Sequence, residues 1–567
     1  MMKRFLFHPF SFVALLLVIM LGAWITYFPV LVSGRFAKNF AAKIGRTVEV
    51  QNGAGYVFSP VFGIGLNDVS FAGASALAEP VVKAKQLIIP ITFGQILSGQ
   101  FSNDALILDN ADIAVAINAQ GHSNVLIELN PTAEKTDADA VVAQPIAVKL
   151  LNSRFHFSDE RTTSTFKLEQ VSGGAQFFDD GSLTWRGTAA LNSQFITIDA
   201  TLGSIARSFA EGSPLDLNID GVASALAFSG RIATTNSLNL VGTADLSSQD
   251  APRLLRWLGA DIKGLNDNKT LTLSGPLESN GAVFNFKTAA LTYASMQAKG
   301  DISFAAGKLR PRISANLAFN TLNFDVYKTN SLKGGSGWDE RPFNLEDLGA
   351  VDAEFSVSTS VLKYNGLKLG PSTLEGSLKD QVLDLTLQGE AQSGGSVKIA
   401  VALDPLQNPA KFNLNLNLNR VEAKEILGGL FDTKFISGPL TLTSTLNSSG
   451  ASQAALISNL SGTVNAAIEN GALSGVDLRN TLASISTNPT EGWAGETTPI
   501  VRAKLAATVL EGVATLGDNQ FQGSGLSFQS TGEIDLLRQS LDLSVVPKTL
   551  SPISISGPWS KPKIGLK

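Results

Sequence analysis

The side chains that most often carry enzyme chemistry are scarce in this sequence. Its 567 residues include no cysteine and three histidines, His8, His122 and His156. Nucleophile–base pairs and transition-metal sites draw chiefly on histidine, cysteine and paired carboxylates. The histidines lie far apart, and His156 alternates with apolar residues as a polar side chain on a strand would. We therefore expect each histidine to be solvated or locally hydrogen-bonded, and we assign no catalytic residue, no cofactor and no metal ligand.

Four short fragments resemble pieces of nucleotide or calcium sites. Gly53-Ala54-Gly55, Gly63-Ile64-Gly65 and Gly523-Ser524-Gly525 begin like a dinucleotide fingerprint, but each lacks the third glycine and the strand–helix context. Asp179-Asp180-Gly181 is not followed by a loop of EF-hand length that ends in glutamate. We expect all four fragments to be tight turns, and we do not expect the chain to be an enzyme.

Strict alternation of apolar and polar residues is the strongest pattern in the sequence. From Lys411 to Arg420 the sequence reads KFNLNLNLNR, and similar alternation recurs over 215–220 and 383–388. Successive side chains of an extended strand point to opposite faces, so each run predicts a strand with one apolar and one polar face. The apolar residues of these runs, our candidate lining residues, are Leu215, Leu217, Ile219, Leu383, Leu385, Leu387, Phe412, Leu414, Leu416 and Leu418.

The sequence leaves two roles open for these apolar faces. They either pack against a second layer as an ordinary sandwich core, or they line an open trough. Sheets beyond about ten strands curl or split and do not stay flat. Because alternation extends over most of the chain, we expect a mainly β fold: a long, twisted and curled antiparallel sheet that forms a groove. Short helices are expected over 251–258, 421–430 and 477–485.

Charged residues are balanced and sparse. The chain has 44 Lys plus Arg and 49 Asp plus Glu, and 16% of its residues are charged against 44% hydrophobic. This balance argues against a nucleic-acid partner held by phosphate neutralisation. The charged fraction lies below the roughly 25% that is typical of soluble domains, and Asn, Ser, Thr and Gly occupy the polar positions instead.

The N-terminal segment is long and apolar enough to cross a membrane. No charged residue occurs between Arg4 and Arg35, and about 20 apolar residues suffice for a spanning helix. Lys3 and Arg4 indicate a cytoplasmic N-terminus. The predicted anchor residues are Phe10, Leu15, Leu16, Leu17, Ile19, Leu21, Trp24, Tyr27 and Phe28, with the last three at the far interface. Cleavage near Val32 and Gly34, as in a signal peptide, is the alternative.

Changes in composition divide the remainder of the chain. A cytoplasmic stub and anchor (1–34) precede a first β unit (35–130), a linker (131–145), a middle β unit (146–326), a second linker (327–342) and a C-terminal β unit (343–567). At the start of the first β unit, Phe36, Phe40 and Ile44 recur every four residues. This spacing predicts a short amphipathic helix beside the membrane surface.

Two regions carry a recognisable order of strand and turn motifs. After the apolar segment come Ile44-Gly45-Arg46-Thr47-Val48, Phe58-Ser59-Pro60 and Gly65-Leu66-Asn67-Asp68-Val69-Ser70. Residues 457–478, ISNLSGTVNAAIENGALSGVDL, and the closing run over 523–566 form the second region. These motifs resemble the AsmA family of bacterial envelope proteins. The resemblance covers about 10–110 and 340–567, and none of its motifs is catalytic.

The resemblance implies a single-pass inner-membrane protein whose bulk lies in the periplasm and which takes part in outer-membrane biogenesis. Proteins similar to this one are thought to carry phospholipids between membranes, so membrane lipids, namely phospholipid and possibly lipopolysaccharide, are the expected partners. An assembly factor that contacts outer-membrane or periplasmic proteins, for example by strand addition, is the alternative. A hydrolase of envelope glycan or lipid is a third hypothesis.

Overall fold

The chain folds into two compact units that consist mainly of strands. Unit 1 comprises Met1–Trp257 and Leu273–Phe286, and unit 2 comprises Leu258–Thr272 and Lys287–Lys567. Strands make up 64% of the computed structural model, so the prediction of a mainly β fold with few helices is confirmed. The structure describes residues 9–44, 46–73, 80–99, 105–125, 145–162, 164–234, 237–260, 269–305, 307, 310–327, 338–364, 366–431, 435–475, 477–478, 490–491, 496–523, 525–548, 551–559 and 561–567.

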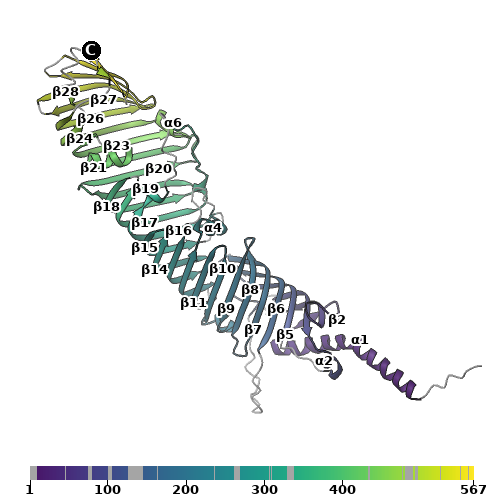
Figure 1. Ribbon diagram of the computed structural model, residues 1–567. Helices are drawn as coiled ribbons and strands as arrows, with labels where there is room; N and C mark the ends of the chain where they lie inside the picture. The colour runs from purple at the N-terminus through teal and green to yellow at the C-terminus, as the bar shows by residue number, and fades with distance from the viewer. Residues whose placement is uncertain are drawn as a thin grey trace, which may run out of the picture. The chain divides into compact units, whose positions relative to one another are not determined.

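Unit 1 joins a long N-terminal helix to an open sheet (Figure 1). Its elements are α1 (Pro9–Ile44), β1 (Val48–Val50), β2 (Ala54–Val57), β3 (Gly63–Phe71), β4 (Val82–Pro90), α2 (Phe93–Ser98), β5 (Ala105–Ile117), β6 (Ile146–Asp159), β7 (Ser164–Phe177), β8 (Leu183–Leu191), β9 (Gln194–Leu202), α3 (Ile205–Ser208), β10 (Ser213–Gly221), β11 (Ser224–Ala233), β12 (Asn239–Ser248) and α4 (Ala251–Trp257). The strands β13 (Leu271–Asn280) and β14 (Val283–Tyr293) cross the division between the units.

The strands of unit 1 pair almost entirely in chain order. Strand β3 pairs with β1 and β2 on one side and with β4 on the other, and β6 to β12 follow one another as antiparallel neighbours. The exception is β5, which runs parallel to β6. Parallel neighbours need a crossover connection. The predicted linker 131–145 therefore joins two adjacent strands of one sheet, and its residues 131–144 lie outside the described residues.

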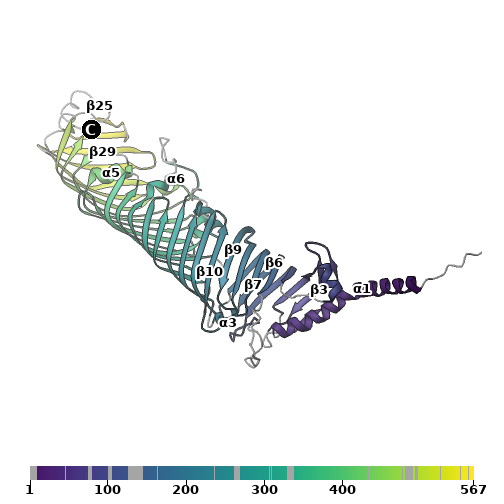
Figure 2. The same ribbon diagram turned by 60° about the horizontal axis from the view of Figure 1, so that its bottom comes forward.

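Unit 2 repeats this arrangement with more strands (Figure 2). Its elements are β15 (Met296–Ala305), β16 (Arg312–Asn323), η1 (Phe324–Tyr327), η3 (Glu346–Gly349), β17 (Asp352–Tyr364), β18 (Leu367–Lys379), β19 (Val382–Ala391), β20 (Ser396–Asp404), β21 (Lys411–Glu422), α5 (Ala423–Phe431), β22 (Ile436–Ser437), β23 (Pro439–Ser449), α6 (Gln453–Ser458), β24 (Ser461–Ser474), β25 (Thr490–Glu491), β26 (Thr497–Leu510), β27 (Val513–Gly523), β28 (Leu526–Asp535), β29 (Ser540–Pro547), β30 (Ile553–Pro558) and β31 (Lys563–Leu566).

The strand order in unit 2 again contains one parallel step. Strands β16 and β17 are parallel, and the other ladders from β15 to β31 are antiparallel. The predicted linker 327–342 connects the two parallel strands, and its residues 328–337 lie outside the described residues. The two compact units divide between residues 257 and 287, away from both linkers, so the six-segment division made from the sequence stays a prediction.

Aligned bulges bend the sheet of unit 1. The registers of the β6–β7 and β7–β8 ladders shift beside Asn152 and Gln170, and both residues have positive φ. The side-chain amide of Asn152 donates to Oδ1 of Asn110 at 2.9 Å, which joins the bulge on β6 to a residue of positive φ on β5. Because bulges bend a strand and increase its twist, bulges that follow one another on adjacent strands curl the sheet.

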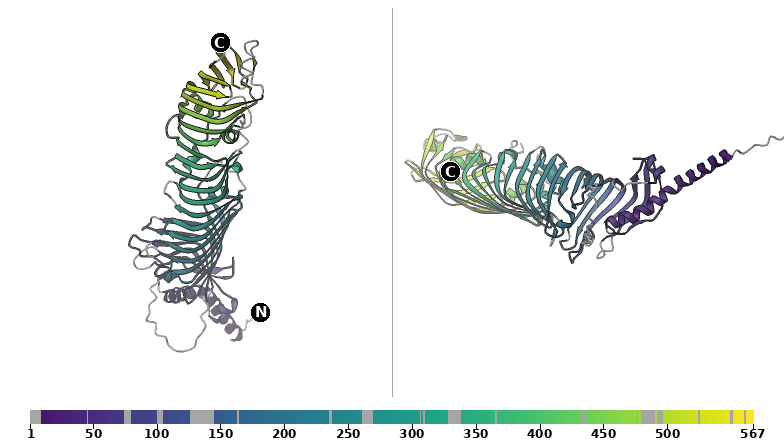
Figure 3. Two further views of the ribbon diagram at one scale, coloured as in Figure 1. Left: turned by 90° about the vertical axis from the view of Figure 1, so that its left-hand side faces the viewer. Right: turned by 90° about the horizontal axis from the view of Figure 1, so that it is seen from below.

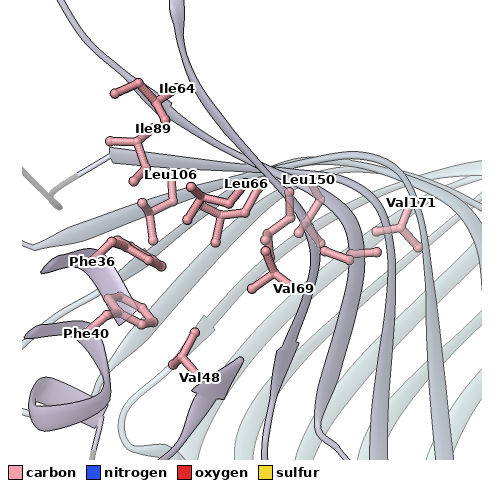
Figure 4. Packing of buried hydrophobic residues seen from close by; sticks show 14 of the residues in the cluster. Phe36, Phe40, Val48, Ile64, Leu66, Val69, Ile89, Leu106, Leu150 and Val171 are labelled. Atoms are coloured by element: carbon pink, nitrogen blue, oxygen red, sulfur yellow. The ribbon is translucent and has the colours of Figure 1, made fainter. Parts of the chain in front are cut away.

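Helix α1 is one continuous helix, and its second half packs on the sheet. Phe28, Val32, Phe36 and Phe40 recur every four residues and are 0%, 0%, 0% and 6% exposed. They join the cluster around Val48, Leu66 and Val69, and Figure 4 shows Phe36 and Phe40 turned toward these strands. The prediction of a separate amphipathic helix at the membrane surface is therefore wrong. The segment is part of α1, and Phe36 and Phe40 pack against the strands of unit 1.

The short fragments are turns in three of the four places. Gly53 and Gly525 have positive φ, and the Asp180 carboxylate accepts a hydrogen bond from Ser182 N at 2.9 Å beside Gly181. Gly63 and Gly65 instead lie inside β3, so that prediction is wrong. A Cβ atom on Gly65 would lie 2.5 Å from Cγ2 of Val57, so glycine is required there by the close approach of β2.

Two of the three predicted short helices are confirmed, whereas α2, α3 and α6 were not predicted. Helices α4 and α5 lie within two residues of the expected segments 251–258 and 421–430. The third predicted helix, 477–485, falls outside the described residues except for 477–478.

Candidate functional site

The three alternating runs lie on β10, β19 and β21, where the cross-strand register extends them into apolar rows. In unit 2, Leu416 lies opposite Ile399, Ile399 opposite Leu387, Leu387 opposite Leu374, and Leu374 opposite Val357. A second row joins Phe412, Leu403, Leu383 and Leu378, and a third joins Leu414, Val401 and Leu385. Strands lie about 4.8 Å apart, so the row from Val357 to Leu416 is about 19 Å long.

The exposure of these rows bears on the two roles that the sequence left open for them. Val357, Leu374, Leu387, Ile399 and Leu416 are all half-buried, whereas the asparagines that alternate with the apolar residues of β21 are exposed. Neighbours within one layer shield each other only in part, and a second layer would remove the remaining surface from water. These five side chains therefore keep part of their surface accessible, although Val357, Leu387 and Ile399 also pack against a buried hydrophobic cluster of unit 2.

One end of the same face is covered. Helix α5 packs against β18, β21 and β22, and Leu418, Val421 and Ile426 are at most 5% exposed in the cluster beneath it. Leu418 is therefore a core residue. The other nine candidate residues are half-buried. Helix α5 thus covers the apolar face at one end of the strands. Leu414 and Leu416, further along β21, remain partly accessible.

Unit 1 carries its own rows through β10. Leu217 continues a row through Ala200, Trp185, Ala175 and Val148 to Leu106, and Ile219 lies between Ile198 and Leu226. Toward β11 and β12, on the same face, Leu215 and Leu217 pack beside the buried Phe228 and Ala244. The polar face of the same strands carries the ion pair of Arg186 with Asp199, at 2.5 Å. The two faces of the sheet thus keep opposite character.

Aromatic rings cover glycine pairs within these rows. The Cζ2 atom of Trp185 lies 2.9 Å and 2.6 Å from the positions that a Cβ would take on Gly173 and Gly187, which face each other across β7 and β8. Phe355 covers Gly376 in the same way in unit 2. Each ring lies over backbone that would otherwise leave a polar gap in the row. The rings therefore keep the apolar rows continuous where side chains are absent.

The anchor residues divide into two groups along α1. Leu15, Leu16, Leu17, Ile19 and Leu21 are 44–61% exposed, and the candidate membrane span is Leu15–Ala41. Trp24 is half-buried, Tyr27 is 59% exposed, and Phe28 is buried on the sheet. The side chain of Phe10 lies outside the described residues. The sequence did not distinguish apolar residues that face lipid from those that face protein, although the four-residue spacing from Phe28 to Phe40 marks the second group.

Comparison with known proteins identifies the family. The sequence model of the AsmA family matches residues 152–519, from β6 to β27. The chain belongs to the AsmA family. The match includes the middle segment 152–326, where the sequence motifs showed only strand texture, and it omits the N-terminal region on which part of the resemblance rested. No curated protein and no solved structure matches the chain. Membership of the AsmA family, together with the apolar helix α1, indicates a membrane-anchored protein with an envelope-related function.

Proposed function

We propose that this AsmA-family chain shelters the acyl chains of membrane lipids on its apolar rows and conducts them along the sheet without catalysing a reaction. The observation that supports the proposal most directly is the half-buried row from Val357 to Leu416. Such a row exposes apolar surface to water, which is unfavourable in free energy. Acyl chains would remove that cost by covering the row.

The energetics favour passage over tight binding. Each buried CH₂ contributes about 0.8 kcal/mol, both in an apolar groove and in a bilayer. An acyl chain therefore gains nearly the same free energy in either place, and movement from a membrane onto the rows is close to neutral. A neutral path suits a conduit, whereas a storage site would need added polar contacts to hold the headgroup.

The cell envelope is the setting that family membership supports. Helix α1 would anchor the chain in the inner membrane, with both units in the periplasm, and the transported lipid would serve outer-membrane biogenesis. Phospholipid is the proposed cargo, and lipopolysaccharide is the other lipid to be tested.

Strand addition to a client protein is the second candidate, and the sheet edges give it little support. Strand β3 is covered on its outer side by β1 and β2. At the other end, β31 has four residues and pairs with β25. Short, covered edges are how sheets avoid pairing with other chains.

A vesicle assay tests the proposal. The full chain is reconstituted in donor vesicles that contain a self-quenched fluorescent phospholipid, and arrival in acceptor vesicles is measured by dequenching. The double variant Leu387→Glu, Leu416→Glu places two carboxylates in one apolar row, where an acyl chain would have to desolvate them. We expect at least a tenfold slower transfer.

The matched control changes the opposite face of the same two strands. Gln388→Glu with Asn417→Glu adds the same charges on the polar side, and we expect transfer at the wild-type rate. Equal slowing in both double variants, or no transfer by the wild-type chain, would contradict the lipid proposal. Photocrosslinks from β31 to outer-membrane polypeptides would favour the assembly-factor alternative instead.

A further inference from the structure

Two uncharged segments meet at the end of unit 1 that lies beside α1. Residues 54–66 and 87–99 contain no Asp, Glu, Lys or Arg, although 16% of the whole chain is charged and 26 average residues would carry about four such side chains. The segments are neighbours in space: Gly63 pairs with Pro90, and Ile91 N donates to the carbonyl of Phe62 at 3.2 Å. They therefore form one uncharged surface.

Large apolar side chains project from this surface. Phe58 is 78% exposed, Phe93 62%, Leu97 53% and Val61 38%, and we call these four residues the end patch. Phe93 and Leu97 stand on α2, which buries Ile96 toward the sheet and is held by a capping box between Thr92 and Gln95. The fixed helix thus presents one apolar side to the protein and the other outward.

Hydrogen bonds hold the end patch at a defined level on α1. The Trp24 indole N–H donates to the carbonyl oxygen of Ile96, and the Tyr56 hydroxyl donates to the carbonyl oxygen of Ile25, each at 2.8 Å. At 1.5 Å per residue, Trp24 lies about 22 Å along the helix from Pro9. Because tryptophan favours the membrane interface, a bilayer that α1 spans would have its interface near Trp24, at the level of α2 and the turn before β3.

We infer that the end patch inserts into the interfacial layer of the membrane that α1 spans, as a second, independent membrane contact. The bilayer is the occupant because the patch continues the lipid-facing surface of α1, whose residues Leu15 to Leu21 are exposed beyond the strands of unit 1 (Figure 3). A single helix leaves the attached body free to swivel. Contacts through both α1 and the end patch would fix the inclination of unit 1 to the membrane. This inference does not depend on whether the apolar rows bind lipid.

The absence of native cysteine allows a direct measurement of depth. The full chain, carrying Phe93→Cys or Phe58→Cys with a nitroxide label, is reconstituted in vesicles of zwitterionic phospholipid with a minor anionic fraction. Collision rates with oxygen, which partitions into lipid, are compared with those of a water-soluble nickel chelate. We expect the ratio to favour oxygen at least fivefold over that of a label in water.

Matched controls come from equally exposed apolar residues elsewhere in unit 1. Labels at Phe195→Cys and Val241→Cys, whose native side chains are 66% and 55% exposed, should give the ratio found in water. The variant Phe58→Cys, Leu97→Glu should lower the ratio at residue 58 while the far-ultraviolet circular dichroism stays unchanged. A water-like ratio at both patch positions would overturn the inference. Immobilised labels shielded from oxygen and nickel alike would also overturn it, because they would show a protein occupant.

Discussion

The hydroxyl group of Tyr56 donates a hydrogen bond to the carbonyl oxygen of Ile25, 2.8 Å away, and that carbonyl is the one that Pro29 leaves without its helical partner. A proline at position i has no N–H to donate to the carbonyl at i−4. Strand β2 thus supplies the donor that α1 lacks. The hydrogen bond to the Ile25 carbonyl oxygen therefore stabilises α1 at Pro29 and also holds α1 against the sheet.

Tyr56→Phe removes this donor and leaves the Ile25 carbonyl unsatisfied. We expect unit 1 to lose about 1–3 kcal/mol, measured by denaturant unfolding of the full chain in detergent micelles. Pro29→Ala restores an N–H for Ile25, so Tyr56→Phe should cost less in that background. Equal costs in the two backgrounds would show that the hydroxyl does not act through Ile25.

A buried ion pair fastens the turn after β6 to the end of β11. Arg161 donates from Nε and Nη2 to the two carboxylate oxygens of Asp159, at 2.9 and 2.8 Å, and Nη2 also donates to the carbonyl of Thr234 at 3.0 Å. The hydrogen bond to Asp159 raises the pKa of Arg161, so the guanidinium keeps its charge. Asp159→Asn removes the carboxylate that the guanidinium contacts through two hydrogen bonds.

We expect Asp159→Asn to destabilise unit 1 by about 3 kcal/mol. Asp112→Asn is the control, because the pair of Asp112 with Arg154 is exposed and exposed pairs contribute less than about 1 kcal/mol. Hydrogen exchange of the amides in β6, β7 and β11 reports both variants. Equal protection in the two variants would contradict the assigned role of the buried pair.

The glycines under Trp185 give a matched comparison on two faces of one ladder. Gly187→Ala would place a Cβ 2.6 Å from Trp185 Cζ2 and 2.5 Å from the carbonyl oxygen of Ser172, whereas Gly174→Ala meets nothing within 4 Å. We expect Gly187→Ala to cost about 1–3 kcal/mol through overpacking and Gly174→Ala to be neutral. Thermal unfolding measures both, and a neutral Gly187→Ala would show that the ring moves aside freely.

The sequence was a good guide to the strands and a poor guide to which apolar surfaces are covered. The run 411–420 falls inside β21, and its leucines alternate with its asparagines across the sheet as predicted. The covering of Leu418 by α5 could not be predicted, because Leu414, Leu416 and Leu418 have identical local contexts. They differ in their distance from α5, the helix that follows β21 in the sequence and packs over the end of the strand that carries Leu418.

The same limit applied to α1. Phe28, Val32, Phe36 and Phe40 bury one side of α1 on protein while Leu15 to Leu21 stay exposed. The sequence instead grouped Phe28 with the membrane anchor and placed Phe36 and Phe40 on a separate helix. The parallel steps at β5–β6 and β16–β17 were hidden because a long connection resembles a domain linker.

Site-specific photocrosslinking shows whether the apolar row of β21 contacts lipid in the native membrane. A photoreactive residue at position 416, on the apolar row, is compared in the native membrane with one at position 417, on the polar face of the same strand. The account predicts that position 416 captures phospholipid, identified by mass spectrometry after the crosslinked chain is purified, and that position 417 does not. Capture of neighbouring protein alone at position 416, or of equal lipid at both positions, would contradict it.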